Sequence, residues 1–303
     1  MRQIDFMGQR HLAYTLSGIM LLVSIGAVLF QQLNLGLDFT GGTLIEVRYA
    51  VAPSLDAVRQ TLEAAGYRDV SVQTFGASHE VLIRLQQAFD AEVGEQVVSL
   101  LRVGGDSVDL VRAEFVGAQV GEQLRDQSGI GLLVALGMVM VYVAFRFQYK
   151  FAIGAALSQL HDMLIVIGVF ALFQLEFDLT VLAALLAVIG YSLNDTIVIY
   201  DRIRENIRKS RTEDMRVVFN DSINQTLSRT MMTSISTLIV LVALLFLGGD
   251  MLRNFSIALI VGVVVGTFSS IYVASALLLA FKLERRDLIP VKKESSQEEE
   301  ELP

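Results

Sequence analysis

The sequence contains no cysteine, which excludes a disulfide, a thiolate nucleophile and a zinc–thiolate site without indicating a compartment. Charge is scarce as well: 18% of the residues are charged, whereas an average soluble domain has about 25%. The spacings typical of a His/Glu metal site, a serine nucleophile elbow or a phosphate-binding loop do not occur either. The sequence therefore predicts a non-enzymatic protein without a metal, a cofactor or an ATPase of its own.

Apolar residues are abundant, at 53% of the sequence and a mean hydropathy of +0.54. The net charge of −8 argues against nucleic acid as a partner, because nucleic acid would require a basic stripe. Part of that negative charge belongs to an acidic tail with Glu294 and Glu298 to Glu301. This composition predicts a membrane protein rather than a soluble domain.

Six apolar segments are long enough to cross a hydrocarbon layer of about 30 Å as helices. They are roughly residues 12–30, 130–147, 151–173, 181–200, 231–247 and 255–281. Arg10 and His11 resemble the start of a signal peptide, but the apolar stretch is too long and no cleavage site precedes Gln31. We therefore expect an uncleaved anchor and an α-helical polytopic membrane protein with six transmembrane helices.

Lysine and arginine near the ends of the spans predict the orientation. The segments 146–150, 202–216 and 282–293 are basic, whereas the short loop 174–180 has no Lys or Arg and the loop before the last span has only Arg253. The positive-inside rule places the basic segments, and with them both termini, in the cytoplasm.

One long segment on the outer side, residues 32–127, has the pattern of a small folded domain. Strands are expected at 43–49, 70–75, 81–85 and 107–116, and amphipathic helices at 54–65 and 90–101. Ser54 is the expected N-cap of the first helix, Gly66 ends it, and Gly104 and Gly105 end the second. The order βαββαβ predicts an α+β, ferredoxin-like periplasmic domain.

A further helix is expected near residues 213–227, between the fourth and fifth spans. Its apolar positions recur at helical spacing, and Ser210 with Glu213 fits a capping box. Because it lies on the basic side, we expect a separate amphipathic helix that lies flat on the cytoplasmic leaflet.

Asp195 is the clearest charge inside a predicted span, where a charge costs at least about 2.5–3.5 kcal/mol. It shares one helix face with Tyr191, Asn194, Val198 and Arg202 by i, i+3, i+4 spacing. One interpretation is a carboxylate that holds neighbouring helices together. The other is a carboxyl that takes and releases a proton as a cation approaches or departs.

Three other polar residues in the spans each have two interpretations. Arg229, before the apolar half of the fifth span, is the candidate cation, or it extends toward the headgroups. His161 and Asp162, interpreted as lying near the cytoplasmic end of the third span, could relay protons or anchor that helix. Small residues at Gly262 and Gly266 are typical of a helix-packing face.

Several motifs resemble the SecD/SecF family. The segment after the first span resembles the opening of that family's outer domain and consists of Asp38, Phe39, Thr40, Gly41, Gly42 and Thr43. Residues 191–206, YSLNDTIVIYDRIREN, are similar to its fourth-span motif, and 116–121 and the pair His161–Asp162 also match. The likeness covers about residues 10–286, and the length and single modest outer domain are similar to the smaller of the family's two subunits.

The resemblance implies a subunit of the bacterial Sec preprotein translocase in the inner membrane, of the RND superfamily. It implies SecD, the SecYEG channel, YajC and preproteins as partners, and the proton motive force as the energy source for late steps of export. It places Asp195 on the family's intramembrane carboxylate and Arg229 on its functional arginine, with protons as the coupling ion.

Four regions follow, namely 1–31 with the first span, 32–127 as periplasmic domain, 128–282 with spans two to six, and 283–303 as a disordered acidic tail. A structural assembly subunit without proton coupling is the alternative function. A small-molecule exporter is disfavoured because one six-span half with a small outer domain has little room for a substrate pocket.

Overall fold

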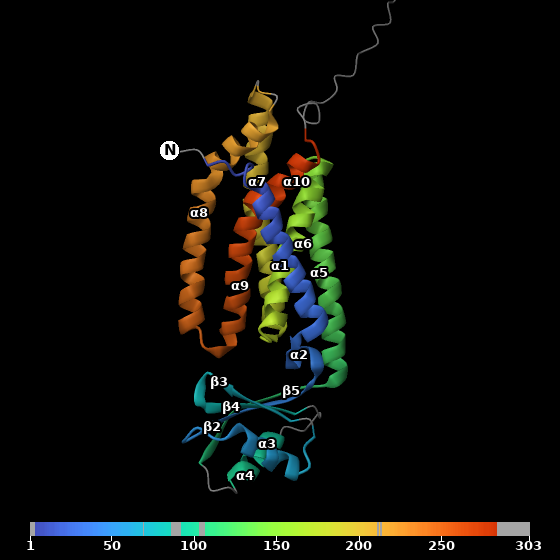
Figure 1. Cartoon of the computed structure of the whole chain (residues 1–303). Helices are drawn as coiled ribbons and strands as arrows, with labels where there is room; N and C mark the ends of the chain where they lie inside the picture. The colour runs from blue at the N-terminus through green and yellow to red at the C-terminus, as the bar shows by residue number, and fades with distance from the viewer. Residues whose placement is uncertain are drawn as a thin grey trace, which may run out of the picture.

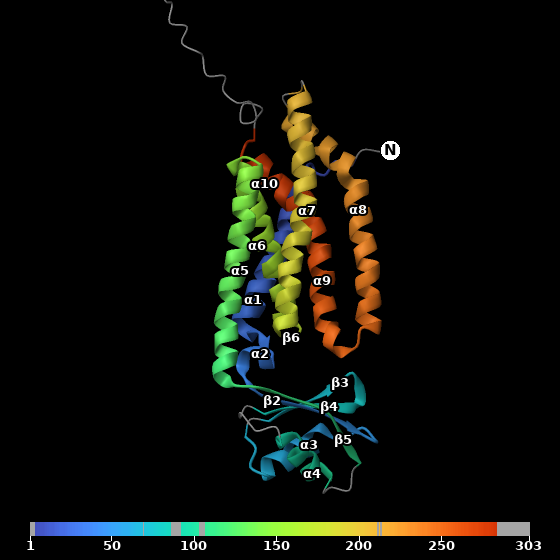
Figure 2. The same cartoon turned by 180° about the vertical axis from the view of Figure 1, so that it is seen from behind.

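Six long apolar helices run side by side in a bundle, and a small α+β domain lies against one end of it (Figures 1 and 2). The computed structural model describes residues 4–68, 70–85, 92–102, 107–210, 212 and 214–283. Within these residues, six helices are long and apolar enough to cross a membrane, which confirms the predicted spans. They are α1 (Arg10–Gln31), α5 (Ala118–Arg146), α6 (Tyr149–Leu172), α7 (Leu179–Lys209), α8 (Met215–Leu247), and α9 (Asp250–Phe268) continued by η1 (Ser269–Ala274) and α10 (Ser275–Ala280).

The two ends of the bundle differ in what they carry. We call the end that joins the α+β domain the domain end, and the opposite end, with Arg146, Arg208 and Lys209, the basic end. The described chain begins and ends at the basic end, as Figure 1 shows. The predicted acidic tail lies outside the described residues from 284 onward.

The domain end is fixed by contacts between the start of the outer segment and the loop before α7. β1 (Asn34–Leu35) pairs in parallel with β6 (Glu176–Phe177), although the two are far apart in sequence. Asp178 caps α7, and its Oδ1 accepts from the Val181 N–H at 2.8 Å. Asp38 Oδ2 accepts from the Leu179 N–H at 3.0 Å, so one more free donor of the first turn is satisfied.

The segment with the two glycines is a tight turn, as predicted from the sequence. α2 (Leu37–Thr40) is a single turn, and Gly41 after it has a φ of +68°, which favours glycine. A Cβ on Gly41 would lie 2.6 Å from the Ala118 Cα, and one on Gly121 would lie 2.8 Å from the Gly41 N. The turn therefore packs directly on the first turn of α5, where only small residues fit.

The α+β domain has one four-stranded antiparallel sheet with strand order β3-β4-β2-β5. Its elements are β2 (Gly42–Tyr49), α3 (Leu55–Ala64), β3 (Ser71–Phe75), β4 (Ala77–Leu85), α4 (Val93–Arg102) and β5 (Val108–Val116). Ile45, Leu62, Val81 and Val97 are fully buried between the sheet and the two helices. Leu44 and Leu82 belong to the opposite face, which Figure 1 shows turned toward the bundle. The predicted helix end at Gly104 and Gly105 lies outside the described residues.

The predicted helix near 213–227 is wrong in two respects. It is no separate element, because α8 runs without a break from Met215 to Leu247, and Asp214, not Ser210, is its N-cap. Its apolar positions do not face a leaflet either, since Val218, Phe219 and Ile223 are buried in the protein core. An amphipathic stripe has the same spacing whether it packs on lipid or on protein, so periodicity could not separate the two. Glu213, of the expected capping box, lies outside the described residues.

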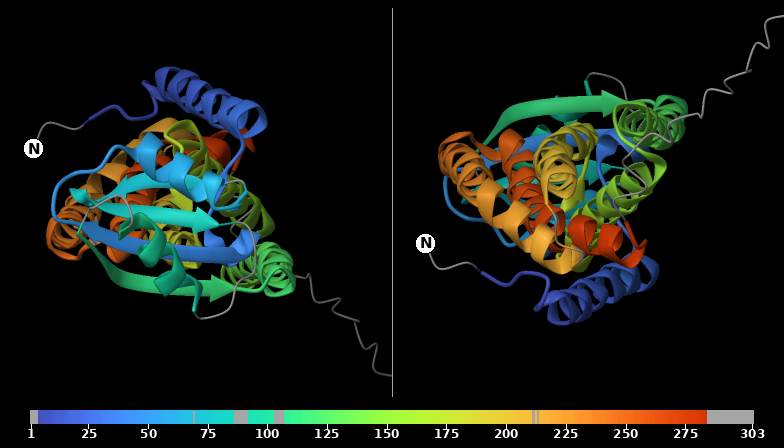
Figure 3. Two further views of the ribbon diagram at one scale, coloured as in Figure 1. Left: turned by 90° about the horizontal axis from the view of Figure 1, so that it is seen from below. Right: turned by 90° about the horizontal axis from the view of Figure 1, so that it is seen from above.

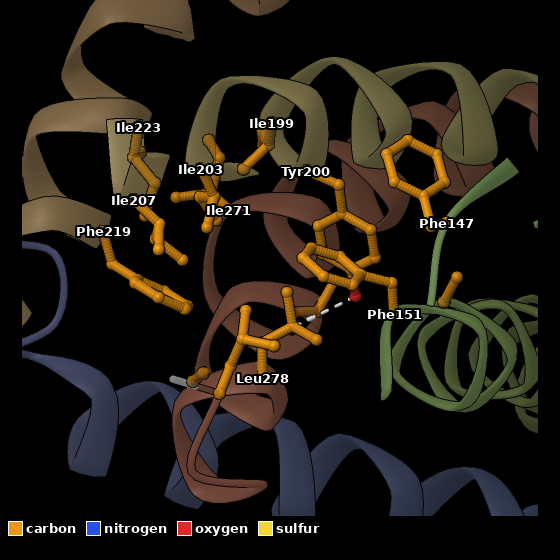
Figure 4. Close-up of a cluster of buried hydrophobic side chains, with 14 of the residues drawn as sticks. Phe147, Phe151, Ile199, Tyr200, Ile203, Ile207, Phe219, Ile223, Ile271 and Leu278 are labelled. Carbon is orange, nitrogen blue, oxygen red and sulfur yellow. Dashed lines mark hydrogen bonds between the residues drawn. The ribbon is translucent and has the colours of Figure 1, made fainter. Parts of the chain in front are cut away.

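That core occupies the basic end and joins α6, α7, α8 and α10 (Figure 4). Tyr200 is fully buried at the centre of this core, and its ring packs edge-on against Phe151 with 5.1 Å between the ring centroids. Its hydroxyl donates a hydrogen bond to the Ala274 carbonyl at 3.2 Å. Phe219 and Ile223 approach from α8 on the other side. The core thus fixes the starts of α8 and α6 against the half of α7 that lies beyond Asp195.

The predicted small-residue face of the last span packs against α7. A Cβ on Gly262 would lie 2.1 Å from a Val188 methyl group, and one on Gly266 would lie 2.8 Å from the Ser192 Cβ. Glycine therefore allows α9 to approach α7 closely beside the polar residues of the spans.

Candidate functional site

Asp195 lies on α7 at the boundary with α8, and its side chain is buried, with 3% of the residue exposed. Its Oδ2 has no hydrogen-bond partner, and the same holds for the buried Thr230 Oγ1 on α8. Buried polar atoms without a partner are rare and costly. Both facing helices thus contribute a buried polar atom without a partner to this boundary, which makes it the candidate site.

Arg229 precedes Thr230 on α8 and is exposed. Its guanidinium lies within electrostatic range of Asp195. No ion pair within 4.0 Å joins these two described side chains. The predicted carboxylate–arginine pair is therefore brought together by the fold, but without direct contact.

A cavity of about 740 Å³ opens between α7 and α8 beside this pair. Asn194 and Arg229 line its inner part, and the lining continues along α7 to Arg208 and Lys209 at the basic end. The remaining lining residues are Ile197, Val198, Asp201, Arg202, Arg204, Glu205, Gln225 and Thr226. Asp195 itself does not line the cavity, which extends from its sequence neighbour Asn194 to the basic end of the bundle. It follows the face that the spacing of Asn194, Val198 and Arg202 predicted.

Charged side chains at the cavity mouth pair with one another. Glu205 accepts from Arg202 at 2.9 Å and from Lys209 at 2.5 Å, whereas Asp201 pairs with Arg146 at 3.5 Å. These pairs are about half exposed, so they contribute little to stability. They leave the positive charge in excess at the mouth.

Tyr191 is half-buried and donates a hydrogen bond to the Ser234 Oγ on α8 at 3.4 Å. Ser234 Oγ also shares a hydrogen bond with Thr267 Oγ1 on α9 at 2.7 Å. These hydroxyls link α7, α8 and α9 one turn further from the basic end than Asp195. Sequence analysis could not assign them, because serine and threonine in spans are also typical of plain packing.

His161 and Asp162 lie in the middle of α6, not near an end of the span as interpreted from the sequence. The interpretation failed because α6 begins at Tyr149, so that the basic loop before it lies three turns away. Asp162 is fully buried, and its Oδ2 accepts from Ser192 at 2.6 Å and from Ser269 at 2.8 Å. Its Oδ1 lies 2.9 Å from His161 Nδ1.

The network around Asp162 joins four helical segments of the bundle. His161 Nε2 bonds to Ser17 on α1, Ser192 belongs to α7, and Ser269 belongs to the π-helical segment η1. Ser192 and Ser269 were missed by sequence reasoning; the only signal was that Ser192 lies three residues before Asp195. Among the residues that the structure describes, no group of three His, Asp or Glu side chains could hold a metal ion.

Six helices long and apolar enough to cross a membrane, with a small α+β domain at one end, are the architecture of a multi-pass membrane protein. The profile of the SecD/SecF C-terminal region, a protein export membrane protein, matches residues 96–284, and the profile of the SecD/SecF GG motif matches residues 26–52. The chain therefore belongs to the SecD/SecF family of protein export membrane proteins, as a SecF-type translocase subunit of the inner membrane.

Curated relatives cover nearly the whole chain. Protein translocase subunit SecF of Pseudomonas aeruginosa is 53% identical over 95% of this chain and 94% of its own length. Protein translocase subunit SecF of Escherichia coli O157:H7 is 41% identical over 99% of this chain and 95% of its own length.

Solved structures of SecDF share the fold. The crystal structure of SecDF, a translocon-associated membrane protein from Thermus thermophilus, is 39% identical, with a TM-score of 0.85 over 92% of this chain. SecDF in its super-membrane-facing form gives a TM-score of 0.70 at 38% identity over 93% of this chain. The present chain spans 39% of each of those SecDF chains.

Proposed function

We propose that this chain couples the proton motive force to protein export, with Asp195 as the group that takes and releases the proton. The observation that carries the proposal is the buried Asp195 oxygen without a hydrogen-bond partner, beside a cavity that leads to the basic end. An unpaired charge in such a place is costly. A carboxyl that exchanges a proton needs an oxygen that no other group occupies, and Asp195 Oδ2 meets this requirement.

Arg229 would respond to the charge of Asp195. Protonation removes the negative charge that attracts the guanidinium, so α8 can shift relative to α7. The Tyr191–Ser234 hydrogen bond, at 3.4 Å, is a weak connection between these helices, which suits such a shift. One charge that crosses the membrane supplies about 2.3 kcal/mol per 100 mV. Protons are thus the coupling ion, and the proposal requires no other cofactor.

The orientation that fits this role places the basic end and both termini in the cytoplasm and the α+β domain in the periplasm. Arg202, Arg208 and Lys209 at the basic end support it through the positive-inside rule. The domain is proposed to be of the ferredoxin-like class, which the strand order β3-β4-β2-β5 with two helices on one face supports.

The domain contacts at the domain end would transmit the movement. Asp38 binds the first turn of α7, the helix that carries Asp195, so a shift of α7 acts on the start of the periplasmic domain. We propose that the domain rocks against a counterpart in SecD and promotes late steps of preprotein movement at the periplasmic face. SecYEG, YajC and preproteins are the further partners in this proposal, by analogy with the translocase subunits that the chain resembles.

The test is precursor export into inverted membrane vesicles, with and without a proton gradient, at matched levels of the complex. Asp195→Asn is expected to abolish the gradient-dependent part of export and to leave co-purification with SecD intact. Asp126→Asn makes the same change on α5, outside the cavity, at an exposed carboxyl, and is expected to export like the wild type.

The alternative function is structural assembly without proton coupling. It predicts that Asp195→Asn weakens the binding of SecD, while any complex that still forms responds to the gradient as the wild type does. A normal gradient response of Asp195→Asn at matched complex levels would therefore refute proton coupling through this residue.

A further inference from the structure

A second cavity lies at the basic end of the bundle, on a different side from the α7–α8 cavity. It has a volume of about 350 Å³ and is lined by Arg10, Tyr14, Arg216, Ala276, Leu279 and Ala280. The three elements that form it are the start of α1, the start of α8 and the end of α10. Figure 3 shows α1 at the margin of the bundle, with α10 beside it. This cavity therefore lies at the margin of the bundle.

The cavity has two cations without a carboxylate partner. Among the described residues, Arg10 and Arg216 form no ion pair within 4.0 Å, whereas Arg146 and Arg202 do. Tyr14 adds a hydroxyl on the same wall as Arg10, one turn further along α1. Two guanidinium groups and a hydroxyl around one cavity match the acceptor oxygens of a phosphate.

Two carboxylates lie near Arg216: Asp214 Oδ1 accepts from the Arg216 backbone N–H at 2.9 Å, and Asp5 is engaged as well. Its Oδ1 accepts from the Gly8 N–H at 2.8 Å and from Asn220 Nδ2 at 2.7 Å. The Gly8 hydrogen bond, followed by that from Asn220 and the charge of Arg216, holds the pKa of Asp5 below its ordinary value. Asp5 thus stays charged without forming an ion pair with Arg216, and the guanidinium remains free for another anion.

An exposed apolar face of α1 continues from the cavity. Ala276 and Leu279 supply apolar walls, and Gly18 lies one turn beyond Tyr14 on the same face of α1. A Cβ on Gly18 would meet no atom within 4 Å, so there is open space at this level. Leu22 and Ile25 extend the same face and are 74% and 43% exposed. The polar part thus lies at the basic end and the apolar part toward the middle of the bundle.

We propose that this cavity binds an anionic phospholipid of the adjacent leaflet, with the phosphate between Arg10 and Arg216 and an acyl chain along the Gly18 face of α1. A phospholipid in this leaflet has its headgroup at the level of the arginines and its acyl chains toward the middle of the bundle. Paired arginines at the membrane surface attract anionic headgroups. A bound lipid would tie α1 and α10 to the start of α8, the helix that carries Arg229.

The test uses the purified, delipidated full-length chain in detergent, titrated with dioctanoyl phosphatidylglycerol or dioctanoyl phosphatidylcholine and followed by native mass spectrometry. We expect the anionic lipid to bind more tightly. In the double variant Arg10→Gln/Arg216→Gln its affinity should fall roughly thirtyfold. Arg125→Gln/Arg253→Gln removes the same charge elsewhere and should bind like the wild type.

A second variant tests the acyl-chain contact on the Gly18 face of α1 separately. Gly18→Leu fills open space without a clash, so the chain should fold and yet bind the anionic lipid more weakly. Equal affinity for the two lipids, or unchanged binding in the double arginine variant, would overturn the proposal. Displacement of the lipid by equimolar inorganic phosphate would also contradict it, because the site would then recognise the phosphate alone.

Discussion

Among the residues whose burial the structure describes, two carboxyl groups are buried in the bundle, and their surroundings differ. Asp162, in the centre, is fully enclosed and accepts hydrogen bonds from Ser192 and Ser269 beside its contact with His161. Asp195, on the α7–α8 boundary, is also buried, but one of its oxygens has no partner and a cavity opens next to it.

The difference in hydrogen bonding indicates two different roles for a buried aspartate. A carboxyl with every oxygen bonded to groups from several helices fixes their arrangement, and removing it leaves those groups unpaired. A carboxyl with an unpartnered oxygen contributes less to the fold, and a change of its charge is what the proposed coupling requires. The comparison predicts that Asp162 matters for stability and Asp195 for coupling.

The largest expected effect is therefore that of Asp162→Leu on stability. The substitution leaves the hydroxyls of Ser192 and Ser269 and the ring of His161 without their buried acceptor. Each buried polar group left without its acceptor costs about 1–3 kcal/mol, so the three together should cost more than about 3 kcal/mol. Unfolding of the purified protein in detergent, followed by circular dichroism, measures the loss.

Asp195→Asn is the matched variant, since it also changes a buried carboxyl in a span. It should change the free energy of unfolding by less than about 1 kcal/mol, because one oxygen of Asp195 has no bond to lose. Equal losses in the free energy of unfolding for the two variants would refute the prediction that Asp162 stabilises the fold more than Asp195 does.

A smaller effect is expected when one donor of the Asp162 network is removed. Ser269→Ala deletes the hydrogen bond of 2.8 Å to Asp162 and should cost about 1–2 kcal/mol. Ser236→Ala is the control, because Ser236 is exposed on α8 and bonds only within its own helix, to Thr233 O. The same unfolding measurement compares them, and a control loss as large as that of Ser269→Ala would mean that helix propensity, not the network, sets the cost.

Much of the fold could be predicted from the sequence, because long apolar runs and strand alternation are local signals. The six spans, the tight turn at Gly41 and the strands of the α+β domain are present as expected. The face of Asn194, Val198 and Arg202 was also predictable, since helical spacing alone brings these residues to one side of α7.

What could not be predicted depends on partners distant in sequence. The stripe of Val218, Phe219 and Ile223 has the same period whether it faces lipid or the core that Tyr200 centres, and only tertiary contacts decide. In the same way, Ser192 and Ser269 are ordinary small residues of a span until the fold brings both to Asp162. The role of the Asp162 network in uniting four helical segments was therefore hidden from the sequence.

The smallest expected effect is a change of stability with pH, and it comes from a third carboxyl, Glu176. This residue lies outside the spans, at the domain end. Arg84 of the α+β domain donates to Glu176 Oε1 and to the Leu35 carbonyl, the latter at 3.0 Å. Burial raises the pKa of Glu176 above its ordinary value of 4.5, and the charge of Arg84 offsets part of that rise. Glu176 thus has a hydrogen-bond partner, as Asp162 does, and also a raised pKa.

The sign of its pH dependence follows from linkage. Because the folded chain binds this proton more tightly than the unfolded chain, the contribution of Glu176 is fully present below pH 4.5 and is lost as the pH rises through the raised pKa. The wild type should therefore lose stability relative to Glu176→Gln as the pH rises above 4.5. Unfolding measured across this range for both proteins gives the difference.

Glu63→Gln makes the same chemical change at an exposed position of α3 and serves as the control. The same slope in this control would mean that the dependence does not come from burial at the domain end. A reversed slope for Glu176→Gln would mean that Arg84 outweighs burial. Glu176 would then be a carboxylate held charged by Arg84, and the contact between the α+β domain and the bundle would strengthen, not weaken, as the pH rises.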